Sequence, residues 1–188
     1  MAAVKKKKIV FVCTGNTCRS PMAEMLLRDT IERLKIKNVT VSSAGIKAKS
    51  GDLMNPKSLQ TLTAKGIPVT EFAAKKLDKR TLKDAFAIVC MTDGQRDLLM
   101  ETRWQALRKA GVEGEFENTV YSFSELAGYE ILDPYGRDLD CYSYVFELLA
   151  GGMSAVLNKL LPENLREYRA EKSKKRASAP RKKKSATP

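Results

Sequence analysis

Short apolar runs alternate with longer amphipathic segments along most of the chain. Four runs are rich in β-branched and other apolar residues and have the length of strands. They cover residues 9–12, 39–43, 86–91 and 119–123. Elsewhere apolar residues recur at helical spacing, which predicts helices over about 21–35, 58–65, 93–110 and 139–161. This alternation predicts an α/β fold: a single domain with an open parallel sheet and helices on both faces.

The pattern also carries expectations about packing and about the place of a site. We expect Trp104 to pack on the core and Gly151-Gly152 to weaken or bend the last helix. Open parallel sheets bind ligands outside the carboxyl ends of their strands, near the point where the strand order reverses. The loop after the first strand is therefore the first place to look for chemistry.

That first strand ends on a cysteine and is followed by a loop of small residues. The segment reads Cys13-Thr14-Gly15-Asn16-Thr17-Cys18-Arg19-Ser20-Pro21. Small side chains let the backbone N–H groups of the loop turn inward, and proline suits the first turn of the helix that follows. Inward N–H groups, a helix N-terminus and a guanidinium together predict an anion cradle with a thiol at its base.

Phosphoryl-transfer chemistry gives each part of this cradle a role. Catalysis of phosphoryl transfer consists largely of positioning and charge stabilisation. The loop N–H groups and the fork of Arg19 are expected to hold the phosphate oxygens. The helix N-terminus, the Ser20 hydroxyl and the arginine favour a thiolate on Cys13, which would attack phosphorus and form a cysteinyl-phosphate.

Other interpretations of these cysteines are weaker. The sequence has no histidine and no Cys-x2-Cys pair, and Cys90 and Cys141 lie far from the loop, so a zinc site is not expected. No Gly-Lys-Ser/Thr follows the glycine, which excludes a Walker nucleotide loop. Cys13 and Cys18 could also be two buried cysteines. We expect neither a metal nor another cofactor.

The spacing Cys-x5-Arg-Ser is typical of the cysteine phosphatases, and the string VCTGNTCRSPMAE resembles the low-molecular-weight protein-tyrosine-phosphatase family. The resemblance covers about residues 7–162. It implies a flavodoxin-like, four-stranded parallel sheet, no metal requirement and phosphorylated proteins as substrates. It also implies that Thr14, Gly15, Asn16, Thr17, Cys18 and Ser20 bind phosphate, and that Ser43 supports the loop through Asn16. Many members place a supporting histidine near Phe72, which this chain lacks.

The leaving group needs a proton donor, and because the chain has no histidine, another residue must supply the proton. The candidate is Asp133 in the segment Asp133-Pro134-Tyr135, which follows the last predicted strand. Alone, Asp-Pro is a common turn pair. In the family, an Asp-Pro-aromatic motif at this place carries the general acid. The resemblance thus implies that Asp133 protonates the leaving group and then acts as base toward water, with Tyr135 in the pocket wall.

The substrate is left open between phosphotyrosine and phosphoarginine. Thr14 resembles the branch that hydrolyses phosphoarginine on proteins, and residues 46–55 lack an aromatic wall for a phosphotyrosine ring. Thr14 could equally be a packing residue.

Two alternative functions are a thioredoxin-coupled arsenate reductase, which needs two further neighbouring cysteines, and a non-catalytic phosphate-binding module. Because Cys18 shares the loop with Cys13, we also consider redox control by a Cys13–Cys18 disulfide.

Charge divides the chain into three parts. The net charge is +12, of which residues 164–188 hold +8 and Lys5 to Lys8 hold +4, so the stretch between is close to neutral. We predict a basic segment at 1–6, a phosphatase domain at 7–163, and a disordered basic tail at 164–188. The tail is either a solubilising extension or an arm for weak contacts with polyanions. Cysteine usage and the lack of a signal-like or membrane-spanning run favour the cytoplasm; the oligomeric state is open.

Overall fold

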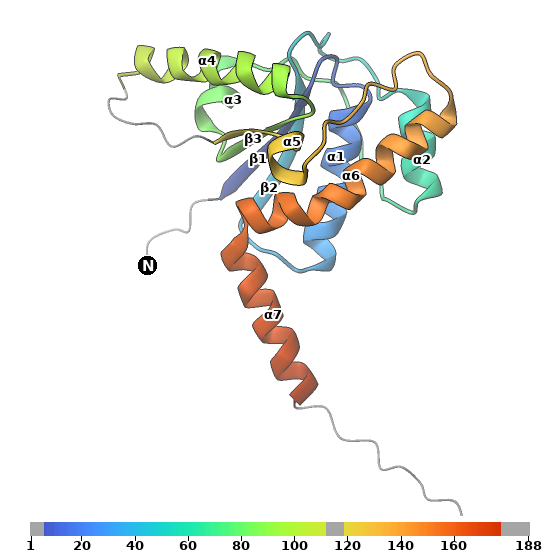
Figure 1. The fold of residues 1–188 in the computed structure, drawn as a ribbon, viewed down its shortest axis with the longest axis vertical. Coiled ribbons are helices and arrows are strands. Elements are labelled where there is room, and N and C mark those ends of the chain that lie inside the picture. Colours follow the sequence, from blue (N-terminus) through green and yellow to red (C-terminus); the bar gives the residue numbers. More distant parts are fainter. Residues whose placement is uncertain (1–5, 112–118, 178–188) are drawn as a thin grey trace, which may run out of the picture.

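Four parallel strands form the centre of the computed structural model, which describes residues 6–111 and 119–177 (Figure 1). They are β1 (Lys7–Cys13), β2 (Val39–Gly45), β3 (Ala87–Cys90) and β4 (Val120–Ser122), in the order β2-β1-β3-β4. Every neighbouring pair is parallel. The predicted α/β class and four-stranded open sheet are confirmed. The strand order reverses between β1 and β3, which places the switch point beside Cys13.

Helices cover both faces of the sheet because its central strand is apolar on both sides. Ile9, Phe11 and Cys13 of β1 pack into one core, and Val10 and Val12 into the other. The first core lies under α1 (Arg19–Arg33), α2 (Pro56–Ala64), α5 (Phe123–Ala127) and α6 (Leu139–Leu160). The second lies under α3 (Lys79–Asp84) and α4 (Asp93–Lys109), on the other side of the sheet in Figure 1.

Several helices begin where a side chain caps the N-terminus, and the spacing of apolar residues does not indicate these caps. Asn55 caps α2, and Pro56 occupies its first turn, so this helix begins two residues before the predicted start. Ser122 and Glu125 form a capping box that starts α5 and ends β4 at Ser122. Asp78 caps α3, a six-residue helix that the sequence pattern did not indicate.

The expectation that Trp104 packs on the core is wrong, whereas a weakening or bending of α6 at Gly151-Gly152 stays a prediction. Trp104 is 37% exposed, because α4 buries only Leu99 and Arg103 along its length. Helix α6 runs without interruption through Gly151-Gly152. A Cβ at Gly152 would lie 2.3 Å from the Phe123 ring, so this glycine allows α5 and α6 to pack closely.

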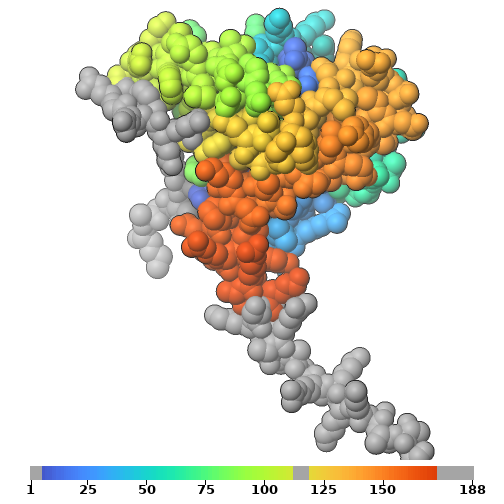
Figure 2. All heavy atoms as spheres, in the orientation of Figure 1, coloured from blue at the N-terminus to red at the C-terminus, as the bar shows by residue number. Residues whose placement is uncertain are grey.

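The predicted disorder of residues 164–188 is wrong for residues 164–177. Helix α7 spans Pro162–Ala177 and projects away from the body (Figures 1 and 2). Its first turn packs on the core through Leu165, which is 8% exposed, so the folded part extends beyond residue 163. Strong helix formers continue it, and Lys172 lies over the Tyr168 ring one turn away. The other predicted tail residues, 178–188, and residues 1–5 of the N-terminal segment lie outside the described part.

Within residues 6–111 and 119–177, no single helix is long and apolar enough to cross a membrane. Helices α6 and α7 meet that test only as a pair, across a bend of 101°. The apolar residues of α6 lie in the core against the sheet, including Tyr142, Val145 and Leu149. The apolar composition of α6 is therefore explained by its packing within the fold.

The contact of Gly152 with Phe123 can be tested by adding one methyl group. We expect Gly152→Ala to lower the free energy of unfolding by about 1–3 kcal/mol, because the added Cβ overpacks the interface between α5 and α6. Gly94→Ala is the matched control, since a Cβ on this α4 glycine meets nothing within 4 Å. Urea titrations of both variants measure the difference; an equal effect would contradict the packing argument.

Candidate active site

The segment between β1 and α1 wraps its polar groups around the Cys13 sulfur. Cys13 ends β1 and is 2% exposed. The backbone N–H of Asn16 donates to its Sγ over 3.2 Å, and the Ser20 hydroxyl lies 3.0 Å from it. Asn16 Nδ2 donates to Ser20 Oγ, so the single hydroxyl proton of Ser20 points either at the sulfur or at Ala44 O, 3.4 Å away. The buried sulfur is thus surrounded by polar groups of its own loop.

Asn16 fixes the shape of this nucleophile loop. Its backbone is left-handed at φ +54°, a conformation that asparagine tolerates better than most residues. Its Nδ2 donates to Ser20 Oγ over 2.9 Å and to Ser43 Oγ over 2.8 Å. Its Oδ1 accepts from the backbone N–H of Lys75 over 2.8 Å. The fully buried amide thus joins the loop to β2 and to the segment before α3.

The predicted contact between Asn16 and Ser43 continues into a network that the sequence pattern did not indicate. Ser43 Oγ donates to Glu24 Oε2 over 2.6 Å, and Glu24 forms an ion pair with Arg28 at 2.6 Å. The Glu24 side chain is 7% exposed, so the ion pair and the serine together compensate its buried charge. Only the spacing of Glu24 and Arg28, four residues apart on one helix face, could have indicated this pair.

The end of β2 lies directly against the loop. Ile46 N–H donates to Cys13 O over 3.0 Å, and Lys47 N–H donates to Thr14 O over 2.9 Å. A Cβ at Gly45 would lie 2.7 Å from Thr14 O and 2.8 Å from Asn16 N. Glycine is required there because the two backbones approach so closely.

Arg19 and Asp133 lie 114 positions apart in the sequence, yet they form an ion pair and line the same pocket as Cys13. Arg19 Nη2 lies 2.6 Å from Asp133 Oδ2, and Nη1 donates to Ile131 O over 3.2 Å. The guanidinium is buried, and in the described part of the chain its Nε has no hydrogen-bond partner. Ile131 N–H donates to Met91 O at the end of β3, which fixes the loop that carries Asp133. The Nε–H of the arginine is therefore a buried donor that no described residue satisfies.

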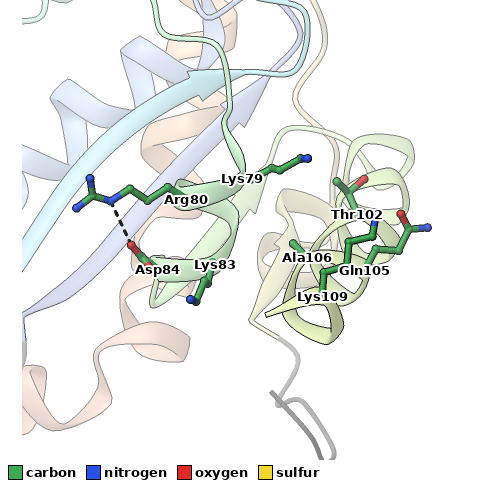
Figure 3. Close-up of a pocket in the computed structure, with 8 residues that line it drawn as sticks. All are labelled: Lys79, Arg80, Lys83, Asp84, Thr102, Gln105, Ala106 and Lys109. Carbon is green, nitrogen blue, oxygen red and sulfur yellow. Dashed lines mark ion pairs between the residues drawn. The ribbon is translucent and has the colours of Figure 1, made fainter. Parts of the chain in front are cut away.

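A catalytic pocket of about 250 Å³ unites most of the predicted site residues. Its lining consists of Cys13, Thr14, Gly15, Thr17, Cys18, Arg19, Asp133 and Tyr135. Tyr135 stands at the rim and is 73% exposed. Asn16 and Ser20, which were predicted to bind phosphate, and Ser43 are not in the lining; their hydrogen bonds hold the sulfur and the loop in place. A larger hollow of about 550 Å³ between α3 and α4 (the basic hollow) shares no residue with this pocket (Figure 3).

Two further pocket residues have partners that the sequence pattern did not indicate. Thr14 Oγ1 accepts from Gln95 Nε2 over 3.2 Å, and Gln95 Oε1 accepts from the N–H of Met91 over 3.1 Å. Cys18 Sγ lies 3.3 Å from the Tyr142 hydroxyl, whose pKa is raised by burial and by this thiol. The pairing of Cys13 with Cys18 stays a prediction; both are free thiols here.

The described residues contain no group of three His, Cys, Asp or Glu side chains that could hold a metal ion. The polar groups that converge on the pocket are N–H donors, a guanidinium, a thiol and one carboxylate. This set suits an anion, whose charge the donors and the guanidinium can share.

Comparison with known proteins agrees with this geometry. The family model described as low molecular weight phosphotyrosine protein phosphatase matches residues 8–169. The chain belongs to this family. A probable low molecular weight protein-tyrosine-phosphatase, EpsP of Ralstonia nicotianae, is 33% identical over 79% of this chain and 92% of its own length. A protein-arginine-phosphatase of Bacillus subtilis is 31% identical over 71% of this chain and 83% of its own length.

Solved structures of phosphatases share the fold. The YwlE arginine phosphatase from Geobacillus stearothermophilus matches with a TM-score of 0.70 and 29% identity, over 85% of this chain and 96% of that one. A low molecular weight protein tyrosine phosphatase from T. tengcongensis matches with a TM-score of 0.70 and 29% identity, over 82% and 100%. Relatives of both substrate types are thus similar to this family member to about the same degree.

Two substitutions at Asn16 separate its backbone role from its side-chain role. Asn16→Ala loses the three side-chain hydrogen bonds and the tolerance for a positive φ, whereas Asn16→Gly loses only the hydrogen bonds. We expect both to reduce phosphatase activity at least tenfold, with alanine about 1 kcal/mol less stable than glycine. Initial rates and urea titrations measure these effects. Full activity in Asn16→Gly would show that the side chain does not organise the loop.

Proposed function

We propose that this protein is a cysteine-dependent protein phosphatase that transfers the phosphoryl group to Cys13. The single observation that carries the proposal is one pocket in which Cys13, Arg19 and Asp133 converge, with the last two 2.6 Å apart. A nucleophile, an oxyanion binder and a proton donor are the three groups that this chemistry needs. Phosphorylated proteins are the substrates, as expected for the family.

The first half-reaction forms the phosphoenzyme. Loop N–H groups and Arg19 bind the three equatorial oxygens while the Cys13 thiolate attacks phosphorus in line. The phosphate competes with Asp133 for the guanidinium, which frees the carboxyl group to carry a proton. Asp133 donates that proton to the leaving oxygen of tyrosine, or to the leaving nitrogen of arginine. A bond forms between sulfur and phosphorus as the bond to the leaving group breaks.

The second half-reaction restores the enzyme. Asp133, now ionised, accepts a proton from a water molecule that attacks the phosphorus of the cysteinyl-phosphate. Phosphate leaves and the thiolate returns to the donors around it. The Asp133 side chain is about half exposed, so water can reach its carboxylate. A related YwlE arginine phosphatase, a mutant with a phosphorylated active-site serine, supports a phosphoenzyme on the nucleophile.

The two alternative functions fit less well. An arsenate reductase needs further reactive thiols, but Cys90 is fully buried in β3 and burial raises the pKa of its thiol. A buried, protonated cysteine is a poor nucleophile. A non-catalytic phosphate-binding module would not need an acid beside the arginine, yet Asp133 stands there.

Phosphoarginine is the substrate that the local geometry favours over phosphotyrosine. Thr14 follows the nucleophile in the pocket, and its bond to Gln95 fixes it there. Residues 46–55 provide no aromatic side chain to stack on a tyrosine ring. The relatives include both protein-tyrosine-phosphatases and protein-arginine-phosphatases, so this preference rests on Thr14 and the missing ring.

Location and further partners are also proposals. The four cysteines are free thiols, which suits a reducing compartment such as the cytoplasm. Exposed cationic side chains on α7, including Arg169 and Lys172, would give weak, salt-dependent contacts with polyanions. These contacts lie on a helix that projects from the body, so they would not alter turnover of a small aryl phosphate.

Roles in catalysis can be separated by leaving group. Cys13→Ser should abolish turnover while oxyanion binding survives. Asp133→Asn should lose about 10²–10⁴-fold on substrates with poor leaving groups and far less on an activated aryl phosphate, because only the former need the acid. Steady-state rates over a series of aryl phosphates measure this. An equal loss across the series would remove Asp133 from the role of general acid.

Substrate choice can be tested at Thr14 and its partner. Thr14→Ile adds bulk beside the nucleophile and removes the bond to Gln95, and it should reduce kcat/KM on phosphoarginine more than on phosphotyrosine. Gln95→Leu removes the hydrogen bond to Thr14 without adding bulk beside the nucleophile, so we expect a smaller decrease in the ratio of kcat/KM on phosphoarginine to kcat/KM on phosphotyrosine. Parallel assays on both phosphoamino acids give the ratio. No phosphoarginine activity in the wild type would overturn the preference.

A further inference from the structure

A second hollow opens directly beside the catalytic pocket. It has a volume of about 530 Å³, and Gly15, Thr17 and Tyr135 line both spaces. We call it the flanking hollow; its outer wall is the segment from Lys47 to Pro56. The catalytic pocket, at about 250 Å³, has room for a phosphorylated side chain but not for the polypeptide that carries it. The chain on one side of that residue must therefore leave through a neighbouring surface.

The outer wall is fastened to the nucleophile loop. Lys47 N–H donates to Thr14 O over 2.9 Å, and Asn55 N–H donates to Thr17 O over 2.9 Å. These two bonds attach both ends of the wall to residues beside the phosphate cradle. The flanking hollow therefore keeps a fixed position relative to Cys13, which a surface that selects substrates requires.

The charge of the hollow favours an anionic occupant. Lys47 and Lys49 are exposed, and neither forms an ion pair with any carboxylate in the described residues. Asp52 is the one acidic side chain in the lining, which leaves an excess of positive charge. A carboxylate entering the hollow would meet ammonium groups that pair with no carboxylate of residues 6–111 and 119–177.

Exposed apolar side chains stand at the same place. Leu53 is 77% exposed and Tyr135 is 73% exposed, the two highest values among large hydrophobic side chains in the part of the chain that the structure describes. Both line the flanking hollow. Large side chains exposed together on a monomer often mark a contact surface. They would pack against the backbone and aliphatic parts of a bound peptide.

We propose that the flanking hollow is a substrate subsite that binds an acidic side chain of the substrate protein within about three residues of the phosphorylated one. Three extended residues span about 10 Å, enough to pass from one space into the next. Lys47 and Lys49 bind the carboxylate, and Leu53 and Tyr135 hold the peptide between them. The proposal rests on the proposed phosphatase function and names the class of protein on which it acts.

Matched peptides test it. Two sets, one with phosphotyrosine and one with phosphoarginine, carry Glu-Glu, Ala-Ala or Lys-Lys on both sides of the phosphorylated residue. The wild type should prefer the Glu-Glu peptides about three- to tenfold in kcat/KM, mainly through KM, as two solvent-screened ion pairs predict. Lys47→Glu/Lys49→Glu should reverse the order in favour of Lys-Lys. Turnover of a small aryl phosphate should change much less, since it does not reach the hollow.

The control makes the same change of charge elsewhere. Lys79 and Lys109 line the basic hollow between α3 and α4, which shares no residue with the flanking hollow (Figure 3). Lys79→Glu/Lys109→Glu should keep the wild-type order of peptides. Equal kcat/KM of the wild type on the Glu-Glu, Ala-Ala and Lys-Lys peptides would overturn the subsite. A preference for Glu-Glu that persists in Lys47→Glu/Lys49→Glu, or that the control variant loses to the same extent, would overturn it as well.

Binding separates this proposal from the one on which it rests. Cys13→Ser leaves the flanking hollow unchanged, so its affinities for the same peptides should follow the same order without any turnover. A wild-type enzyme inactive on the phosphotyrosine peptides, the phosphoarginine peptides and the aryl phosphates would overturn the phosphatase function, and the order of affinities would still decide the subsite. Equal affinities for the three flanks would reject the subsite even if phosphatase activity were found.

Discussion

The Asn16 amide carries the constraint on which the site depends. A loop that turns its N–H groups inward is an unfavourable conformation for a free chain, because the donors converge and one residue has a positive φ. Three hydrogen bonds from one buried side chain oppose that cost. They tie the loop to α1, to β2 and to the backbone at Lys75. The shape of the cradle is therefore set by parts of the chain far from it in sequence.

The sheet determines where this loop stands. β1 is buried on both faces and ends on Cys13, and β3 and β4 lie on its other side from β2. The loop after β1 and the loop that carries Asp133 consequently leave the same edge of the sheet. Met91 O accepts from Ile131 N–H and holds the second loop against the first. Arg19 and Asp133 meet because of this topology.

How far the sequence predicts this structure depends on the kind of signal. Strand runs and the Cys-x5-Arg spacing are local patterns, whereas Asp133 was singled out through the family resemblance. The structure brings Cys13, Arg19 and Asp133 into one pocket. Gln95 and Glu24 were not predicted, because a single polar residue on a helix has many ordinary explanations. Lys75 contributes only its backbone N–H, which leaves no trace in the sequence. Helix α7 was predicted as disorder because it lacks an apolar stripe, whereas its first turn packs on the core through Leu165 and Asn164 Nδ2 donates to Lys37 O. The family resemblance, by contrast, supplied the role of Ser43 that its hydrogen bond to Asn16 supports.

The most direct measurement is to capture the phosphoenzyme. Asp133→Asn lacks the base for the second half-reaction, so it should accumulate the phosphoryl group when it is mixed with an activated aryl phosphate and quenched rapidly. Peptide mapping by mass spectrometry then locates the group. Our mechanism predicts one phosphoryl group per chain, on Cys13, and none when Cys13→Ala is added to the same variant or Arg19 is replaced by alanine. Release of phosphate at the normal rate with no phosphoryl group on Cys13, or with the group on another residue, would contradict it.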